Sequence, residues 1–365
     1  MPMYKPDSVL LWITGVLMVV GLILLSSASV VLSNQVAGNS YYYVVRQLIL
    51  GIGGGIVAFL VAYFVPLAVW RRAAFGLFIF SIILLSLVFL PHIGHHALGA
   101  QRWLSFGGFT VQPSEITKMT FAIYLAALLS RKNDKHAKHN QNLMPFFVSV
   151  GVLAVLIIAQ PDMGTLGVIA LSSLILFFIS GAKIQQVLLI ILIGAVAAYV
   201  LVKVEPYRTN RLTVFLHPNT DKQGIGYQIN QAFIAVGSGG IFGRGFGNSL
   251  QKYNYLPEPM SDSIYAIVVE ELGIVGGLAL LLVFMALFWR GLSLAIATDN
   301  QFYKLLAVGV SSVIIVQAFI NIMAILGLIP LTGITLPFVS YGGSSYITML
   351  FAIGILTQIS RYATL

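Results

Sequence analysis

The acidic side chains are the residues of this chain best suited to chemistry, because there are only eleven of them among 365 residues. The chain has no cysteine, which excludes disulfides, thiol nucleophiles and thiolate metal sites. Among the carboxylates, Asp262 stands at the start of a long apolar stretch, directly after Leu-Pro-Glu-Pro-Met-Ser. A carboxylate in that position can remove a proton from a substrate hydroxyl as a general base. It can also do no more than cap the helix that follows.

Basic residues near the same apolar boundaries suit an anionic substrate. Arginine presents a planar fork of donors that matches phosphate oxygens, and fixed charge near a bilayer surface acts in a low dielectric. The basic residues in such positions are Arg102, Lys118, Arg208, Arg211, Arg244 and Lys252. Lys118 has a second interpretation, since it lies one turn after Glu115 and could simply form a local ion pair with it.

The sequence contains no dedicated metal motif and no cofactor-binding motif. Glu115 or Asp262 could supply oxygen ligands to a divalent cation. We therefore expect no cofactor beyond a divalent cation such as Mg²⁺ or Mn²⁺.

The composition places these residues in a membrane protein. Hydrophobic residues make up 58% of the chain and charged residues 8%, whereas a soluble domain carries roughly a quarter charged residues. The formal charge of +9 fits basic loops beside anionic lipid, so we expect no nucleic-acid partner. The chain is predicted to be an all-α polytopic integral membrane protein, one membrane domain over residues 1–365 with about ten transmembrane helices.

The predicted spans are the apolar stretches of near-spanning length. They lie near residues 9–32, 47–65, 73–90, 114–130, 145–160, 165–181, 184–203, 263–289, 303–326 and 341–360. The first is too long for the core of a signal peptide, and we expect it to be retained. The stretches 145–160 and 165–181 are short and separated by one turn, so they could instead form one broken helix pair.

Lysine and arginine predict the orientation. On one side of the predicted membrane stand Lys5, Arg71, Arg72, Arg131, Lys132, Lys135, Lys138, Lys183, Arg290, Lys304 and Arg361. The short loops opposite hold only Arg46, Arg102 and Lys118. The positive-inside rule then puts both termini in the cytoplasm and leaves a large extracytoplasmic loop, residues 204–262, between spans 7 and 8.

Most of the carboxylates fall on the predicted outer side. These are Glu115, Asp162, Glu205, Asp221, Glu258 and Asp262, several of them beside prolines at span boundaries. Their convergence predicts a polar cavity open to the outside. Glu270 and Glu271 lie roughly 12 Å deeper at 1.5 Å per residue. Ionisable groups inside a span face a polar cavity or a partner, so these two could either serve a site or lock helices together.

The extracytoplasmic loop contains a glycine-rich segment, residues 224–247. Its stretch 227–236 mixes polar and apolar residues, as an interfacial or re-entrant helix would. A dinucleotide-binding loop is excluded because no strand–helix–strand pattern surrounds it. The glycines could let the backbone approach a phosphate or a sugar closely, or they could form a flexible connector.

Five long strings resemble one known family. They are GAQRWLSFGGFTVQPSEITK (99–118), NRLTVFLHP (210–218), GYQINQAFIAVGSGGIFGRGFGNSLQK (226–252), YLPEPMSDSIYAIVVEELG (255–273) and PLTGITLPFVSYGGSS (330–345). In order and over essentially the whole chain, they are similar to the SEDS proteins, typified by FtsW, RodA and SpoVE. The wording of the last two strings is closest to the FtsW and SpoVE branch. Ser263, where the family usually has Phe, and Ala232, where it usually has Ser, depart from the pattern.

The resemblance implies a peptidoglycan glycosyltransferase that polymerises lipid II at the outer face of the bacterial cytoplasmic membrane. It implies Asp262 as the catalytic carboxylate. It also implies partners, namely a class B penicillin-binding protein that crosslinks the new strands and other division or elongation membrane proteins. The substrate-contacting residues that we expect within or near these strings are Arg102, Glu115, Lys118, Arg208, Arg211, Gln228, Lys252, Glu258, Ser340 and Ser344.

Two other functions remain open on the residues alone. A lipid II flippase or transporter predicts repeated halves and charged sites near the bilayer midplane, and Glu270 and Glu271 are the residues that favour it. A non-catalytic division scaffold gives no reason for an exposed acid among external basic residues. Transfer of a sugar from a lipid diphosphate needs only one carboxylate, because the diphosphate leaves readily once its charge is neutralised, whereas glycoside hydrolysis needs two.

Overall fold

The computed structural model of the protein describes residues 4–91, 94–97, 100–106, 109–130, 143–217 and 224–364. Asp221 and the basic residues at 131–138 lie outside the described residues. Within the described part, helices account for each of the ten predicted apolar stretches. The chain is an all-α membrane protein in its main architecture.

Seven helical segments of the described residues are long and apolar enough to cross a membrane. They are α1 (Ser8–Ala28), the run Tyr42–Phe64 formed by α3 (Tyr42–Arg46), the π-helix η1 (Gln47–Gly53) and α4 (Gly54–Phe64), then α5 (Leu67–Leu87), α9 (Ile184–Val204), α12 (Ile264–Ile296), α13 (Gln301–Ile325) and α14 (Gly343–Ser360). Two shorter apolar helices are α7 (Leu143–Ala159) and α8 (Met163–Ile179). The more polar α6 (Pro113–Ser130) carries Glu115 and Lys118. The number of ten membrane crossings stays a prediction.

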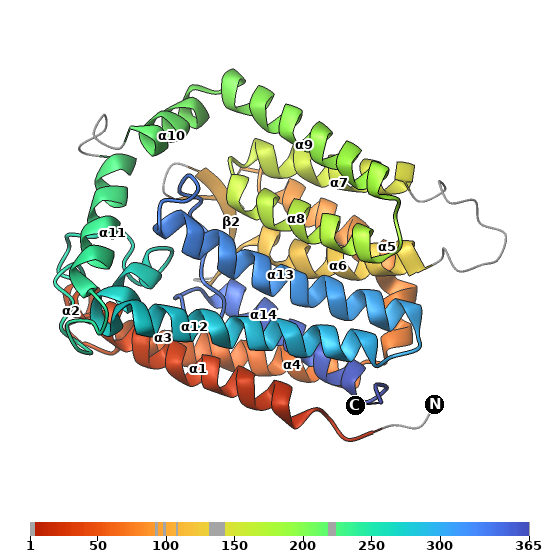
Figure 1. The fold of residues 1–365 in the computed structure, drawn as a ribbon, viewed down its shortest axis with the longest axis horizontal. Helices are drawn as coiled ribbons and strands as arrows, with labels where there is room; N and C mark the ends of the chain where they lie inside the picture. The colour runs from red at the N-terminus through yellow and green to blue at the C-terminus, as the bar shows by residue number, and fades with distance from the viewer. Residues whose placement is uncertain are drawn as a thin grey trace.

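Helices α13 and α14 form the centre of the bundle. Nearly every side chain of α13 is buried, and the helix packs against α6, α8, α12 and α14. Figure 1 shows α1 and α12 along one side of these two helices and α7 and α9 along the other. A helix that is apolar on all its faces belongs in such a core. The side chain of Asn300 caps α13 by accepting hydrogen bonds from the backbone N–H groups of Phe302 and Tyr303.

The stretches 145–160 and 165–181 form two separate helices that pack against each other, α7 and α8. Asp162 begins α8, since its carboxylate accepts a hydrogen bond of 3.2 Å from the backbone N–H of Thr165. This is the common role of an aspartate at a helix start. Asp162 therefore positions α8.

A small antiparallel sheet was not predicted from the sequence. It consists of β1 (Gly94–Ala97), β2 (Ala100–Phe106) and β3 (Phe109–Val111), in that order. In the register of the sheet, Leu104 of β2 lies opposite Gly94 of β1 and Val111 of β3. Strands this short carry little periodicity, so the apolar spans around them dominated the sequence pattern.

The segment between α9 and α12 contains two short helices, α10 (Pro206–Leu216) and α11 (Ile225–Gly239), at one end of the bundle (Figure 1). The predicted helix near 227–236 corresponds to α11. Whether α11 re-enters the membrane stays a prediction. The helix α2 (Val30–Ala37) lies at the same end and follows α1.

The glycines after α11 pack against α12. A Cβ at Gly239 would lie 2.0 Å from the carbonyl oxygen of Val269, and a Cβ at Gly273 would lie 2.2 Å from that of Ile241. Gly273 has a φ of 72°, which favours glycine, and interrupts the helical geometry of α12. The backbone N–H of Ile274 then donates to Gly240 at 3.0 Å. These glycines allow one backbone to lie on another, which neither a phosphate-binding loop nor a flexible connector predicts.

The two ends of the chain lie together at the opposite end of the bundle (Figure 1). The backbone N–H of Tyr4 donates to the carbonyl oxygen of Arg361 at 2.8 Å. Close by, Arg290 binds the Asp7 carboxylate through Nε at 2.6 Å and Nη2 at 3.1 Å. Termini on the same side agree with the predicted topology, while the assignment of that side to the cytoplasm stays a prediction.

Candidate active site

A cavity of about 770 Å³ lies at the end of the bundle where α12 and α14 begin. Its walls come from α3 and η1, from β2 and β3, from α10 and α11, and from the loops that precede α12 and α14. The predicted site residues that line it are Arg102, Arg211, Gln228, Glu258, Asp262 and Ser344. Residues distant in the sequence thus meet around one space of a size suited to a small-molecule substrate.

Asp262 does not act as the cap of α12. The N-cap position belongs to Ser263, whose hydroxyl accepts a hydrogen bond of 3.0 Å from Gln228. The backbone carbonyl of Asp262 is held by Asn321 Nδ2 at 2.8 Å. Its Oδ1 is buried without a hydrogen-bond partner in the part of the chain that the structure describes. The residue is therefore positioned through its backbone, and it stays only partly buried at the cavity wall.

The surroundings of Asp262 favour its protonated form at neutral pH more than water does. Loss of hydration is the main cause that raises the pKa of Asp262, to about 7, and the negative charge of Glu258 adds to it. The backbone N–H, Gln228 and the positive charge of Arg211 act in the opposite direction. A carboxylate whose pKa lies near the working pH is well suited to general base catalysis.

The cavity also contains cations. Arg211 of α10 donates from Nη1 to the carbonyl oxygen of Leu331 at 2.9 Å, and its charge acts on Asp262. Arg102 of β2 donates from Nε to the carbonyl oxygen of Gln160 at 3.1 Å and from Nη2 to that of Pro161. Arg102 thus fastens the sheet to the turn between α7 and α8. Among the predicted cations, Arg211 is the one whose positive charge lowers the pKa of Asp262.

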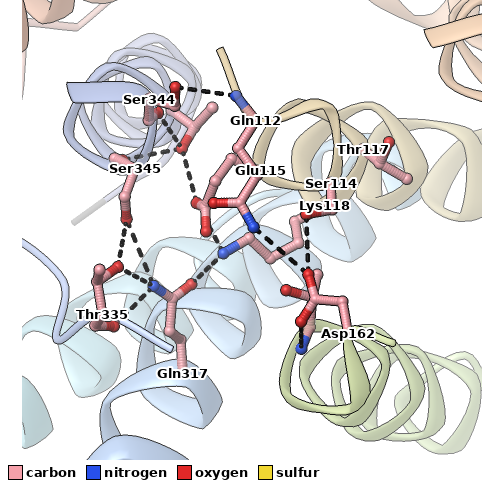
Figure 2. Close-up of polar contacts among 12 residues, drawn as sticks. Gln112, Ser114, Glu115, Thr117, Lys118, Asp162, Gln317, Thr335, Ser344 and Ser345 are labelled. Atoms are coloured by element: carbon pink, nitrogen blue, oxygen red, sulfur yellow. Dashed lines mark hydrogen bonds and ion pairs between the residues drawn. The ribbon is translucent and has the colours of Figure 1, made fainter. Parts of the chain in front are cut away.

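Glu115 and Lys118 lie behind the cavity wall. Lys118 Nζ is 2.8 Å from Glu115 Oε2, and both side chains are buried. Lys118 also donates to the Gln317 side chain, and Gln317 Nε2 donates to the carbonyl oxygen of Thr335 at 2.9 Å. Figure 2 shows this chain of contacts from Glu115 to Thr335 and Ser345, two residues that do line the cavity.

Glu115 and Lys118 do not line the cavity, so their contact with the substrate stays a prediction. Their charges neutralise each other because they stand one helical turn apart on α6. Thr348 adds a hydrogen bond of 3.4 Å to Glu115. The pair is linked to cavity residues through Gln317 to Thr335 and Ser345, and through Thr348 to Ser344.

Three further predicted residues also have structural partners and do not line the cavity. Arg208 donates to the carbonyl oxygens of Leu201 at 3.2 Å and Ile158 at 3.3 Å. Ser340 donates to the carbonyl oxygen of Ser261 at 2.6 Å. These contacts place Arg208 between helices and Ser340 under the loop that carries Asp262.

Lys252 is the third of these residues. Its Nζ lies 3.1 Å from Glu271 Oε1, 2.6 Å from the carbonyl oxygen of Gly247 and 3.0 Å from Ser27 Oγ. Glu270 meanwhile accepts hydrogen bonds from the backbone N–H groups of Leu250 at 3.0 Å and Gln251 at 3.4 Å. Of the two interpretations of Glu270 and Glu271, the structure supports the structural one, because the two side chains fasten α12 to the segment 247–252.

Several cavity residues were missed by sequence reasoning. They are Arg46, Gln47, Trp103, Gln112, Thr335 and Tyr341. Trp103, Gln112, Thr335 and Tyr341 stand inside the strings quoted above, so their position in those strings was an available signal. Arg46 and Gln47 lie outside the strings, and a single arginine at a span boundary looks like an ordinary membrane anchor.

Comparison with known proteins identifies the family. The family model for FtsW, RodA and SpoVE, described as "Cell cycle protein", matches residues 8–365. The chain belongs to this family. It is 40% identical over 359 residues to stage V sporulation protein E of Bacillus subtilis, covering 98% of each. It is 39% identical to the "Probable peptidoglycan glycosyltransferase FtsW" of Escherichia coli O157:H7, over 97% of this chain and 85% of that one.

Solved structures of the FtsW, RodA and SpoVE family share the fold. One comes from a study titled "Structural coordination of polymerization and crosslinking by a peptidoglycan synthase complex", with a TM-score of 0.80, 26% identity and 98% coverage of both chains. Another is the rod shape determining protein RodA of Thermus thermophilus, with a TM-score of 0.72, 23% identity and 98% coverage of both chains. The family assignment confirms the resemblance and places the chain in a bacterial membrane.

Proposed function

We propose that this protein polymerises lipid II into glycan strands at the outer face of the bacterial cytoplasmic membrane, with Asp262 as the general base. The chain is an enzyme of the class for which its curated relatives are named, the peptidoglycan glycosyltransferases. The observation that carries the proposal is the position of Asp262, a partly buried carboxylate that lines the same cavity as Arg211 and feels its charge.

The transfer needs one proton acceptor and one stabilised leaving group. The hydroxyl of the acceptor sugar forms a bond from its oxygen to the anomeric carbon of the donor sugar. The bond from that carbon to the diphosphate oxygen breaks, and the hydroxyl proton passes to Asp262. Because the polyprenyl diphosphate leaves as an anion, cationic donors fixed nearby lower the barrier.

Arg211 is suited to the leaving diphosphate. It lines the same cavity as Asp262 and acts on that carboxylate. A guanidinium fork offers two parallel hydrogen bonds to phosphate oxygens. Arg102 lines the cavity as well, although its donors also hold the turn between α7 and α8.

A divalent cation remains part of the proposal, but with a different set of ligands from the one expected from the sequence. Glu115 is ion-paired with Lys118, so it does not join Asp262 in one ligand set. The described residues contain no cluster of three or more acidic or histidine side chains that could hold a metal ion. A Mg²⁺ or Mn²⁺ ion brought by the diphosphate would meet Asp262 and Glu258 as the carboxylates of the cavity.

The proposed partner is a class B penicillin-binding protein that crosslinks the product. The structural relative with 26% identity belongs to a complex that coordinates polymerization and crosslinking. We extend that arrangement to this chain as a proposal, together with contacts to other division or elongation membrane proteins.

The test is polymerisation of purified lipid II by wild type and by Asp262→Asn, each with a partner that lacks transpeptidase activity. Glu205→Gln is the matched control, since Glu205 is an exposed carboxylate outside the cavity. We expect polymer on a gel from wild type and from the control, and none from Asp262→Asn. Polymer from Asp262→Asn would remove Asp262 from the mechanism.

The flippase alternative loses its main support, because Glu270 and Glu271 are engaged by the segment 247–252. A folded wild-type complex that makes no polymer would bring the flippase back. Translocation of labelled lipid II across vesicle membranes would then be measured. A scaffold would show neither activity.

A further inference from the structure

Arg46 is a cation of the cavity that the proposed step does not use. It ends α3, directly before the π-helix η1, and its side chain lines the cavity. The side chain is half-buried, and Nη1 donates to the Tyr42 hydroxyl at 3.2 Å. A partly buried arginine carries its charge at any physiological pH, so an anion bound beside it would be stabilised.

No carboxylate supplies that anion within the described part of the chain. The ion pairs found there belong to Lys118, Arg244, Lys252 and Arg290. Arg102 donates hydrogen bonds to two backbone carbonyl oxygens, and the charge of Arg211 lowers the pKa of Asp262. Arg46 is thus a cavity cation whose charge is not balanced by a protein carboxylate among these residues.

The wall beside Arg46 is apolar. Ile49, Leu50, Gly54 and Ile347 line the cavity on the same side. Ile49 is 65% exposed and belongs to the run Tyr42–Phe64, which is long and apolar enough to cross a membrane, so we expect this apolar wall to adjoin the lipid. An anion attached to a hydrocarbon chain matches a cation placed at the end of such a wall.

The segment 340–342 separates Arg46 from Asp262. On one side, the backbone N–H of Gly342 donates to Gln47 Oε1 at 3.3 Å. On the other, the backbone N–H of Tyr341 donates to the carbonyl oxygen of Met260 at 2.8 Å. The cavity therefore has Arg46 near Tyr341 on one side of this segment and Arg211 near Asp262 on the other, with Arg102 of β2 as a third cation in its wall.

We propose that Arg46 binds the diphosphate of the acceptor substrate, a polyprenyl-diphosphate-linked sugar, while the diphosphate of the donor lies beside Arg211. This inference rests on the proposed glycosyl transfer. The donor diphosphate is bonded to the reacting carbon, so it must lie close to Asp262. The acceptor keeps its diphosphate throughout, with its sugars between that group and the reacting hydroxyl, and so needs a second cation farther along the cavity.

The first experiment counts bound ligands. Native mass spectrometry of the full chain with undecaprenyl diphosphate should give two bound molecules for wild type and one for Arg46→Gln. Arg46→Lys keeps the charge but loses the fork, and we expect partial retention. Arg72→Gln is the matched control, because Arg72 is exposed and does not line the cavity.

Competition separates the sources of the anion. Inorganic diphosphate and phosphatidylglycerol should each fail to displace the second molecule of undecaprenyl diphosphate. Displacement by phosphatidylglycerol would overturn the proposal in favour of a general lipid headgroup site. Displacement by inorganic diphosphate would overturn it as well, because it would show that the polyprenyl chain of the ligand plays no part in binding. Two molecules bound to Arg46→Gln would also overturn it.

The second experiment tests the acceptor role in elongation of a preformed labelled strand. Arg46→Gln should raise the lipid II concentration for half-maximal rate about tenfold, the effect of losing a charge-assisted hydrogen bond. The maximal rate should change little, whereas Arg211→Gln should lower it. An unchanged half-maximal concentration would overturn the acceptor role. If wild type makes no polymer but Arg46→Gln still loses one bound diphosphate, the transfer function fails and the anion site remains.

Discussion

The backbone carbonyl oxygen of Asp262 accepts a hydrogen bond of 2.8 Å from Nδ2 of the buried Asn321 side chain. The same Nδ2 donates to the carbonyl oxygen of Ile334, also at 2.8 Å. Asn321 belongs to α13, a helix that is buried over most of its length. The central helix therefore fixes both the loop that carries Asp262 and the loop that leads to α14.

Removal of these two hydrogen bonds should misplace Asp262. Asn321→Leu keeps a similar volume but has no donor. We expect about a tenfold lower maximal rate of polymerisation with little change in the lipid II concentration for half-maximal rate, because small displacements of a catalytic group are costly. Ser312→Ala is the control on the same helix, since the Ser312 hydroxyl has no partner among the described residues. Equal rates for Asn321→Leu and wild type would show that Asp262 is held in other ways.

The rate of polymerisation should rise with pH through about 7. Asp262 accepts a proton only as the carboxylate, and its pKa is raised to about 7, chiefly by loss of hydration and then by Glu258. Glu258→Gln removes a nearby negative charge, so it should lower the pKa of Asp262 and move the acidic limb to lower pH. Arg211→Gln removes a positive charge and should move the limb to higher pH.

Initial rates measured across about pH 5 to 9 test these shifts, with a bell-shaped or sigmoidal profile as the readout. Glu205→Gln should leave the limb in place. A limb that is identical in all variants would mean that another group sets the pH dependence.

The buried Glu115–Lys118 pair should contribute more to the free energy of unfolding than an exposed charged residue does. Lys118→Met leaves a carboxylate buried without its partner, which costs about 3–5 kcal/mol. The double variant Glu115→Gln/Lys118→Met leaves no uncompensated charge and should recover part of that loss. Thermal unfolding in detergent gives the comparison, with the exposed Lys5→Met as the control. No recovery in the double variant would argue that the hydrogen bond from Lys118 to Gln317 is the stabilising contact.

Lys252 should behave as a structural residue. Lys252→Met leaves Glu271 without its cationic partner, so the segment 247–252 should loosen from α12 and the unfolding temperature should fall. Binding of lipid II per folded molecule should stay close to that of wild type, because Lys252 does not line the cavity. A weaker affinity without a fall in unfolding temperature would restore Lys252 as a substrate contact.

The sequence alone determined the helices and their class. In a bilayer, every backbone polar group must be bonded within its own segment, so an apolar run of sufficient length has few alternatives to a helix. Local spacing was equally informative. Lys118 stands three residues after Glu115, and one helical turn is enough to bring the two together. Long motifs inside the chain also identified the family, and the same motifs led to the prediction that Asp262 is catalytic.

Only the tertiary structure decided which of the candidate residues share a space. The sequence left the glycines near Gly239 as either a ligand loop or a flexible connector, and the structure packs them on α12. The ion pair between Lys252 and Glu271 likewise became visible only in the fold. Arg46 had no motif at all, yet it lines the same cavity as Asp262. Pairings between distant segments depend on how the helices pack, and the apolar pattern of a membrane protein carries little information about that packing because lipid and helix interiors are similarly apolar.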